Sequence, residues 1–247
     1  MIPIEAEIEE IEELDEGINK MARKISALLE NVRQEKEMQH LTELQLIQAQ
    51  VNPHFLYNTL DTIVWLIEGG MTDDAVEMIS SLSIFFRTSL SKGNDIIPLS
   101  EEERHTLSYL EIQQYRYRDI LEFEINIPKE LSGIPVPKLS IQPLAENALY
   151  HGIKNRRGKG KILIEGREEE DALVLTVSDN GQGMTPERLH EVQEAIRTGE
   201  RAGFGLAAVA ERIALYYGPG YGMKIFSEEG KGTTVEIRLG KNIQPKS

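Results

Sequence analysis

The sequence contains no cysteine, so disulfide bonds, thiolate zinc sites and cysteine nucleophiles are all excluded. It also lacks a signal peptide and any apolar run of about 18 residues, the length that a membrane-spanning helix needs. Basic residues are outnumbered by acidic ones, 27 to 41, and the net charge of −14 argues against binding to nucleic acid. These absences favour a soluble cytoplasmic protein, or the soluble part of a longer membrane protein.

What the sequence does contain is enough apolar material for a sizeable core. Hydrophobic residues make up 40% and charged residues 28% of the 247 residues, which is typical of a soluble globular protein with one or two domains. The hydrophobic periodicity is helical up to about residue 118 and mixed beyond it. This change predicts a domain boundary near residue 119.

Residues 1–40 open with an acidic stretch and continue as a helical repeat. The apolar residues of the repeat are separated alternately by four and three positions, which is the spacing of a coiled-coil seam and predicts a helical dimer. The short step from Ile11 to Leu14 would change the local winding of the supercoil. A plain amphipathic helix is the alternative. The seam consists of Leu14, Ile18, Met21, Ile25, Leu28 and Val32.

His54 lies next to a proline inside the following helical segment. A projection at about 100° per residue places it on a polar stripe, so we expect it to face solvent or a partner. Because Pro53 would cost a helix interior about 3 kcal/mol, either the helix kinks there or Asn52 caps a new helix that begins at Pro53. The polar stripe holds Gln50, His54, Asn58 and Asp61, and the opposite apolar face holds Leu56, Leu60, Ile63 and Ile67.

A helical hairpin is expected over residues 41–90. Gly69 and Gly70 should end its first helix, and Thr72 or Asp73 can cap its second. Two copies of such a hairpin would form a four-helix bundle in a dimer. The second helix is expected to bury Ile79, Leu82, Phe86 and Leu90.

A third helix should begin at Ser100, because residues 100–103 form a capping box, and should end near Tyr117. Beyond residue 119, apolar and polar residues alternate, which is a strand signal. We expect a mixed sheet with helices packed on it. The expected strands are 121–127, 161–167, 172–178, 224–227 and 233–239, and the expected helices are 140–151, 186–198 and 204–216.

The second half carries two motifs with carboxylates. Glu146 and Asn147 on a helix, with His151 one turn later, suit a Mg²⁺ ion that is bound to phosphates. Asp179 follows an apolar strand and could accept a hydrogen bond from an amine such as adenine N6, and the glycines after it would let backbone approach a ligand. Taken alone, the first motif would be an exposed polar helix face and the second a tight turn.

Two glycine motifs follow. Gly203 and Gly205 lead into a helix, whose N-terminus is a ready site for phosphate. Gly232 and Thr233 precede the last strand and could form a hairpin turn and nothing more. A basic cluster between the first two motifs is either a phosphate or acidic-partner contact or a solvated loop. It consists of Lys154, Arg156, Arg157, Lys159 and Lys161.

Two familiar nucleotide-binding classes do not fit. The chain has no P-loop pattern and none of the lysine, catalytic-loop and metal-loop signatures of serine/threonine kinases. The four motifs, in their order, instead resemble the N, G1, G2 and G3 boxes of Bergerat-fold ATPases. The stretch 50–58, with His54 at its centre, and the stretch 137–148 are similar to the phosphoacceptor segment and N box of LytS/YesM-type sensor histidine kinases. The resemblance covers about residues 44–240.

Further upstream, residues 9–21 are similar to the second helix of a HAMP linker, with Glu12 and Ile18 in place of the usual glycine and phenylalanine. This resemblance implies a first HAMP helix, membrane spans and a sensor before Met1. Localisation would then be cytoplasmic, as the intracellular part of a plasma-membrane sensor.

The resemblance implies a role for each matching residue. His54 would be the phosphoacceptor, with Asn58 able to orient its ring, and Glu146 would hold the metal site or polarise the reacting groups. Asn147 would ligate Mg²⁺. Asp179 would read the adenine amine, with Thr233 nearby through water. The remaining nucleotide-binding residues would be His151, Lys154, Gly181, Gly183, Gly203, Gly205 and Leu206.

The implied fold is α+β, with an N-terminal coiled coil and a dimeric helical hairpin, then a C-terminal α/β sandwich of the Bergerat type. Residues 1–40 would be the HAMP helix and coiled coil, 41–118 the dimerisation and phosphotransfer helices, and 119–242 the ATP-binding domain. The implied reaction is autophosphorylation of His54 from Mg-ATP, followed by transfer to an aspartate of a response regulator.

Two departures from the family pattern keep other functions open. Phe55 stands where well-studied sensor kinases have an acidic base, and Ala208 where this group usually has asparagine. They motivate an alternative, a nucleotide-binding signalling scaffold with weak or no kinase activity. A Bergerat ATPase that drives a conformational cycle is the third option, but it leaves the proline-histidine motif unexplained.

Overall fold

A computed structural model describes residues 53–89, 95–154, 156–198, 205–218 and 220–241. The coiled coil expected within residues 1–40 and the HAMP-like segment lie outside these ranges. Backbone contacts divide the chain into two compact units, Met1–Leu56 and Tyr57–Ser247, and the elements below belong to the second unit apart from the first four residues of α2. Among the described residues, no helix is both long and apolar enough to cross a bilayer.

Two helices precede the first strand. Helix α2 (Pro53–Glu68) ends at Gly69–Gly70 as expected, and Gly70 has the positive φ of +74° that favours glycine. Helix α3 (Thr72–Ser89) begins one residue too early for the predicted caps. Its first hydrogen bond runs from the Ala75 N–H to the Met71 carbonyl (3.1 Å), so Met71 occupies the N-cap position instead of Thr72 or Asp73.

The buried face of α3 is rotated from the predicted one. Met78 and Phe85 are buried, whereas Ile79 is 50% exposed, so its predicted burial was wrong. The reason is the packing of α3 on α4, where the Phe85 ring stacks on His105 with centroids 4.7 Å apart. Leu82 and Phe86 are half-buried, and Leu90 lies outside the described residues. Along α2, Ile63 is buried as expected, but Leu60 and Ile67 are exposed.

Helix α4 (Leu99–Arg116) does not begin with the predicted capping box. Pro98 is its N-cap residue and no side chain caps it. The first two N–H groups instead donate to carbonyls of the loop after the short helix η1 (Lys129–Leu131): Leu99 to Ile134 (2.9 Å) and Ser100 to Ser132 (3.0 Å). The local pattern was therefore overridden by a contact with a segment about thirty residues away in sequence.

The five-stranded sheet has the order β2-β4-β5-β7-β6. The pair β2–β4 is parallel and the other pairs are antiparallel. All five predicted strands are confirmed. They are β2 (Leu121–Asn126), β4 (Gly160–Glu168), β5 (Ala172–Asp179), β6 (Gly222–Glu228) and β7 (Gly232–Gly240). A small antiparallel pair, β1 (Ile96–Pro98) with β3 (Pro135–Pro137), was not predicted.

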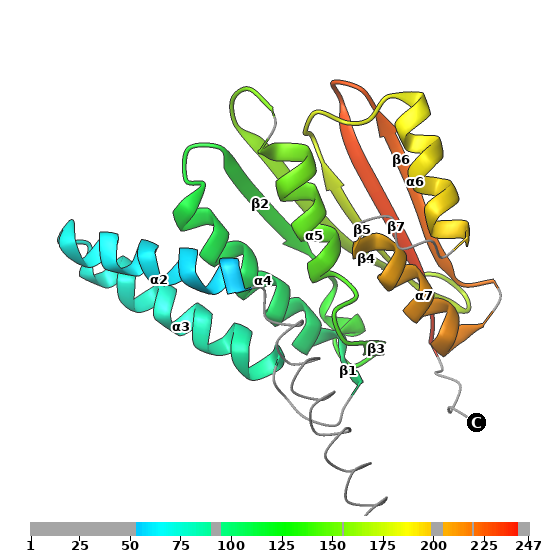
Figure 1. The fold of residues 1–247 in the computed structure, drawn as a ribbon. Coiled ribbons are helices and arrows are strands. Elements are labelled where there is room, and N and C mark those ends of the chain that lie inside the picture. The colour runs from blue at the N-terminus through cyan, green and yellow to red at the C-terminus, as the bar shows by residue number, and fades with distance from the viewer. Residues whose placement is uncertain (1–52, 90–94, 155, 199–204, 219, 242–247) are drawn as a thin grey trace, which may run out of the picture. The chain divides into compact units, whose positions relative to one another are not determined.

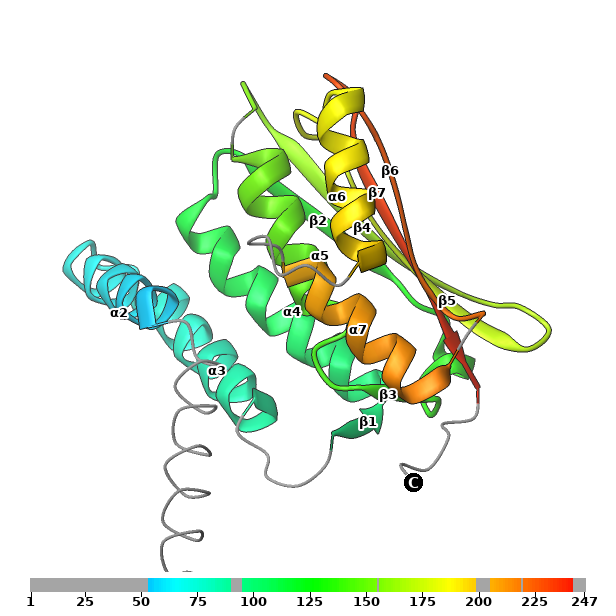
Figure 2. The ribbon, with the colours of Figure 1, turned by 45° about the vertical axis from the view of Figure 1, so that its right-hand side comes forward.

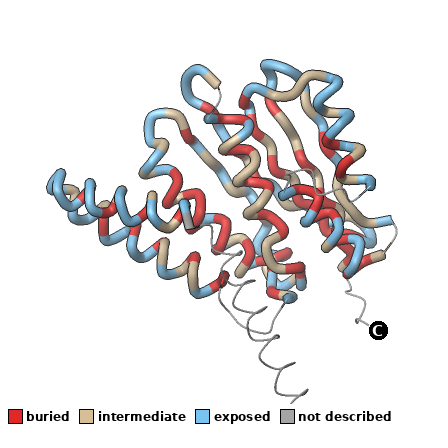
Figure 3. Tube along the Cα trace, viewed as in Figure 1, coloured by how far each residue is buried: buried red, intermediate tan, exposed pale blue. Residues whose placement is uncertain are grey.

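Helices cover one face of the sheet, as Figures 1 and 2 show. They are α5 (Gln142–Asn147), the π-helix η2 (Ala148–Ile153), α6 (Pro186–Thr198) and α7 (Gly205–Tyr217). Buried residues concentrate where these helices and the strands meet (Figure 3), with β5 buried along most of its length. The helical first part and the two-layer α/β second part agree with the predicted fold class. Helix α4 contacts both α3 and β2, and the boundary near residue 119 stays a prediction.

Candidate nucleotide-binding site

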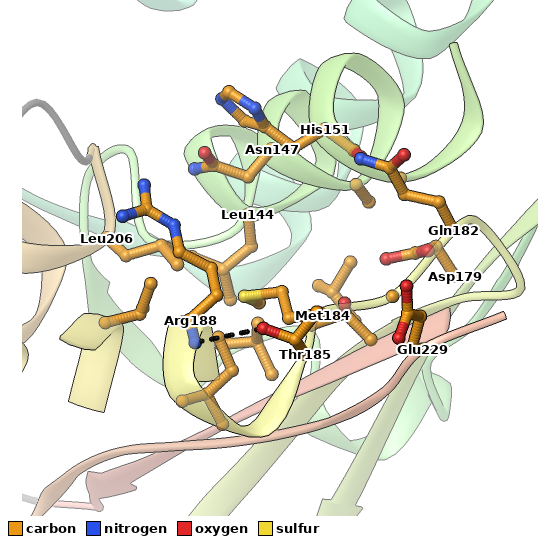
Figure 4. A pocket seen from close by; sticks show the side chains of 18 residues that line it. Leu144, Asn147, His151, Asp179, Gln182, Met184, Thr185, Arg188, Leu206 and Glu229 are labelled. Atoms are coloured by element: carbon orange, nitrogen blue, oxygen red, sulfur yellow. Dashed lines mark hydrogen bonds between the residues drawn. The ribbon is translucent and has the colours of Figure 1, made fainter. Parts of the chain in front are cut away.

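A cavity of about 360 Å³ lies between the sheet and the helices of the α/β part (Figure 4). Its walls are mainly apolar, with a few polar side chains, which is typical of a pocket for a small organic ligand. The apolar walls come from β5, β6, β7 and the helices. They are Leu144, Ala148, Val177, Met184, Val192, Leu206, Ile225 and Val235.

Asp179 ends β5 at the floor of the cavity and is only 9% exposed. Its Oδ1 accepts a hydrogen bond from the Gly181 N–H (2.8 Å). Burial raises the pKa of this carboxyl to about 6, although the N–H groups of Gly181 and Thr233 act in the opposite direction. Thr233 is the partner of Asp179 in the β5–β7 register, so the predicted neighbours are adjacent. The carboxylate is held ready to accept a hydrogen bond from a ligand.

The backbone around Asp179 is packed so closely that side chains are excluded. A Cβ atom on Gly152 would lie 2.4 Å from Asp179 Oδ1, and one on Gly181 would lie 2.3 Å from the carbonyl carbon of Gly152. Gly183 has a φ of +67°, and a Cβ there would lie 1.9 Å from the Glu228 carbonyl oxygen. Glycine is therefore required at these positions by space, and at Gly183 also by conformation.

Asn147 lines the other side of the cavity, at the end of α5. Its Nδ2 donates to the Pro143 carbonyl (2.7 Å), which fixes the amide and leaves Oδ1 available as a ligand. Gly205, at the start of α7, is close by, since a Cβ on it would lie 3.7 Å from Asn147 Nδ2.

Glu146 does not line the cavity. Its carboxylate accepts a hydrogen bond from Gln142 Nε2 (3.1 Å), and burial raises its pKa. Burial, and then the charge of Glu146, raise the pKa of the Tyr109 phenol on α4. The adjacent residues Glu146 and Asn147 therefore lie in different surroundings. The role of Glu146 in the reaction stays a prediction.

The predicted helix 140–151 is interrupted by the π-helix η2, in which the Lys154 N–H bonds to the Leu149 carbonyl (2.9 Å). The wider turn frees carbonyls that bind the loop after β5. Gln182 donates from its N–H to the Gly152 carbonyl (3.2 Å) and from its side chain to the His151 carbonyl (3.0 Å). These two bonds hold the loop that carries Gly181 and Gly183 against η2, and His151 lines the cavity.

The basic cluster does not line the cavity. The Lys154 ammonium lies over the Tyr150 ring, 5.3 Å from its centroid, and Lys159 pairs with Glu122 (3.0 Å). Arg156 donates to the Asn180 carbonyl. Lys154, which was expected to contact phosphate, therefore does not line this cavity.

Six of the predicted site residues line one cavity: Asn147, His151, Asp179, Gly183, Leu206 and Thr233. Gly181 supports its floor and Gly205 adjoins Asn147. Gly203 lies outside the described residues. His54 and Asn58 lie on α2, where His54 is exposed as predicted and Asn58 is half-buried.

Sequence reasoning missed Arg188, the only lysine or arginine among the described residues that line the cavity. Its N–H bonds to Thr185 Oγ1 (3.3 Å), and its side chain pairs with Glu191 (2.6 Å). In Figure 4 its guanidinium lies at the end of the cavity near Asn147 and Leu206, away from Asp179. The spacing of Thr185, Arg188 and Val192 on one helical face was the available signal.

Comparison with known proteins agrees with this geometry. Residues 42–121 match the family described as histidine kinase, and residues 138–243 match the family described as histidine kinase-, DNA gyrase B- and HSP90-like ATPase. The sensor histidine kinase YesM of Bacillus subtilis is 36% identical over 219 residues, which cover 89% of this chain and 37% of YesM. For the sensor histidine kinase BtsS of Escherichia coli K12, the values are 33% over 228 residues, 92% and 38%.

The sensor protein LytS of Staphylococcus saprophyticus is 34% identical over 199 residues, which cover 80% of this chain and 33% of LytS. The second half is thus an ATP-binding α/β sandwich of the histidine kinase, gyrase B and HSP90 type. The chain belongs to the sensor histidine kinases. It spans 33% to 38% of the length of these three relatives.

Proposed function

We propose that this chain is the kinase portion of a two-component sensor, which transfers the γ-phosphoryl group of Mg-ATP to His54 and then to an aspartate of a response regulator. The observation that carries the proposal is the convergence of four separate motifs on one cavity, through Asn147, Asp179, Leu206 and Thr233. An exposed histidine in the region matched to histidine kinases supplies the acceptor.

The polarity of the cavity supports one direction for the bound nucleotide. Asp179 suits the adenine amine, because its buried carboxylate is a strong acceptor when ionised. Arg188 and Asn147 line the other end, where a cation and a side-chain amide suit a phosphate chain (Figure 4). The triphosphate would then extend toward Leu206 at the start of α7.

The residues at this end also suit Mg²⁺. The described part of the chain contains no cluster of three or more histidine or acidic residues that could hold a metal ion without help. Asn147 Oδ1 is a hard oxygen donor, and Mg²⁺ commonly takes one or two protein oxygens with phosphates and water. When bound, the ion would neutralise charge on the phosphates.

The chemistry at His54 is a nucleophilic displacement. The unprotonated ring nitrogen attacks the γ-phosphorus, the N–P bond forms as the bond to the β,γ-bridging oxygen breaks, and ADP leaves with the electron pair. Such transfers rest mainly on positioning and charge neutralisation. Asn58, one helical turn from His54, would orient the imidazole.

The partners follow from the same proposal. A receiver domain of a response regulator would accept the phosphoryl group. A second copy of this chain would complete a four-helix bundle from the helices of each hairpin.

The decisive experiment is incubation with γ-labelled ATP and Mg²⁺. His54→Gln should abolish acid-labile labelling, because no other group is assigned as acceptor. His190→Gln is the matched control, since His190 is also an exposed helical histidine but does not line the cavity. Labelling that survives His54→Gln would refute the acceptor. Nucleotide binding without any labelling of the unmodified protein would instead identify a signalling scaffold.

A further inference from the structure

Glu102 is a carboxylate in the interior of the protein with no exposed surface. It lies in the first turn of α4, within the region matched to histidine kinases. Its Oε2 accepts a hydrogen bond from the Leu139 N–H (2.9 Å) and its Oε1 from the Ile141 N–H (2.8 Å). Burial raises the pKa of Glu102, and bonds from the backbone N–H groups of residues 139–142 oppose that rise. The carboxyl therefore serves a helix other than its own.

The N–H groups that Glu102 binds belong to the segment that leads into α5. Ile141 is the N-cap residue of this helix and makes no side-chain cap hydrogen bond. Helix N-termini carry unsatisfied donors and a partial positive charge, so a carboxylate fixes such an end well. Asn147 follows five residues after the first residue of α5 and points into the nucleotide cavity. The position of its amide thus depends on how the start of α5 is held.

The segment before α5 is held from three sides. Leu139 has a φ of +60°, a conformation that costs a non-glycine residue energy and persists only when its surroundings enforce it. Arg212 of α7 donates to the Lys138 carbonyl, and the Lys138 ammonium donates to the Ser89 carbonyl at the end of α3 (2.7 Å). One short segment therefore connects α3 and α4 with α5 and α7, both of which line the cavity.

We propose that Glu102 is a positioning residue for phosphoryl transfer. By holding the start of α5, Glu102 fixes the position of the Asn147 side chain. The inference rests on the proposed function, because it assigns Asn147 to Mg-ATP. The proposal predicts different effects at the two ends of the cavity. Asp179 is held chiefly by the pairing of β5 with β7, whereas Asn147 lies on α5 itself, at the end of the helix whose start Glu102 holds.

The test is Glu102→Gln, which keeps the size of the side chain but turns an amide donor toward backbone donors. Mg-ATP affinity and the labelling rate should fall roughly 10- to 100-fold, as they do when the support of a metal ligand is removed. Adenosine affinity should fall clearly less than Mg-ATP affinity, because the β5–β7 pairing holds Asp179 as well as its contact with Gly152. Glu103→Gln is the matched control, since Glu103 is the next residue of α4 and is only half-buried.

A double-mutant cycle distinguishes positioning from mere stability. In an Asn147→Ala background, Glu102→Gln should cause no further loss of Mg-ATP affinity if Glu102 acts through Asn147. Equal losses in both backgrounds, or equal losses of adenosine and Mg-ATP affinity, would overturn the proposal. If Glu102→Gln does not fold, Glu102→Asp in the same cycle is the second variant, with the same selective loss of Mg-ATP affinity expected.

Failure of the positioning role and failure of the proposed function give different results. If the unmodified chain takes no label from ATP, the proposed function fails. If the unmodified chain is labelled and Glu102→Gln is labelled at the same rate, only the role of Glu102 fails.

Discussion

Asp179 combines a cost in stability with a gain in recognition. The pKa of Asp179 is about 6 in the fold, against an ordinary value of 3.8, so its surroundings disfavour the charged form. A difference of that size corresponds to about 3 kcal/mol at neutral pH. The same desolvation strengthens a hydrogen bond from a ligand, because little water competes for the carboxylate.

Asp179→Asn should therefore stabilise the ligand-free protein while weakening the binding of ATP. At pH 8 the free energy of unfolding should rise by about 1 to 3 kcal/mol, because the buried charge is gone. ATP affinity should fall roughly 10- to 100-fold, since an amide that donates would face the adenine amine. Urea denaturation and calorimetric titration measure the two effects. A variant that is destabilised and binds ATP normally would contradict this account.

The pH dependence of stability has a definite sign. Between pH 4 and about 6, the native protein holds a proton on Asp179 that the unfolded chain has released, so the contribution of this group to stability falls as pH rises through that window. ATP binding should show the opposite trend, because only the ionised carboxylate accepts from the amine, and affinity should fall as pH drops below about 6. Comparison of titrations of the unmodified chain and of Asp179→Asn isolates this group, and identical profiles would refute its role.

Arg188 is predicted to read the phosphates and not the base. Arg188→Ala should reduce ATP affinity roughly tenfold, through loss of a charge-assisted contact, and leave adenosine affinity unchanged. Arg197→Ala is a close control, because Arg197 lies on the same helix and pairs with Glu194 as Arg188 pairs with Glu191, but does not line the cavity. Equal effects of the two substitutions on ATP affinity would exclude Arg188 from the site.

At the scale of elements, hydrogen bonds to backbone and to a serine hydroxyl hold the loop after β5 to the β6–β7 hairpin. The Gly230 N–H donates to the Gln182 carbonyl (2.6 Å), and the Met184 N–H donates to Ser227 Oγ (2.9 Å). The N–H of Gln182 also holds the π-helix. Three elements that are far apart in sequence thus form one rigid wall of the cavity.

Gly183→Ala should break this wall. The Cβ would meet the Glu228 carbonyl at 1.9 Å, so the loop or the hairpin must move, and ATP binding should be lost along with several degrees of thermal stability. Gly158→Ala isolates the cost of the backbone conformation, because Gly158 also has a positive φ, +84°, but has open space around it. Thermal unfolding and ATP titration of both variants make the comparison. The clash is unimportant if the two behave alike.

Elements with strong periodicity could be predicted from sequence, and contacts between distant segments could not. Helix α6 has the predicted bounds of 186 and 198, because its apolar spacing and Pro186 are local signals. The capping box at Ser100 is also a local signal, yet the helix begins at Leu99 and its first N–H groups donate to carbonyls of another loop. The strands β1 and β3, each three residues long and ending in proline, carry no alternation that could reveal them.

The same division applies to the site. Asp179, Asn147 and Thr233 could be predicted from the sequence, because their motifs occur in a known order. Arg188 belongs to no recognised motif. Glu146 and Asn147 are adjacent, and the fact that Glu146 does not line the cavity depends on the orientation of α5 in the folded chain. Lys154 was expected to bind nucleotide, whereas its ammonium lies over the rings of Tyr117 and Tyr150.

At the scale of the whole molecule, exposed apolar side chains gather on α2 and α3. Val64, Trp65 and Ile67 on α2 and Val76 and Ile79 on α3 are each at least half exposed. Sensor histidine kinases typically work as dimers, and an apolar surface of this kind suits burial against a second copy. The proposed four-helix bundle would cover it.

Ile79→Glu should therefore convert the chain to a monomer and reduce labelling. The introduced charge would have to be buried in the dimer without a partner, which is strongly unfavourable. Phe226→Glu is the control, because Phe226 is similarly exposed, 55% against 50%, but lies on β6. Mass measurement by light scattering decides, and a dimer that persists in Ile79→Glu would remove α3 from the interface.

The closely packed glycines also bear on inhibitor chemistry. The end of the cavity around Asp179 is shaped by main chain at Gly152, Gly181 and Gly183, where added side chains meet atoms within 2.4 Å. A flat heteroaromatic amine of fragment size can match this end without carrying any phosphate. Resistance by substitution would be difficult, because every larger residue at these positions distorts the floor on which the natural nucleotide also depends.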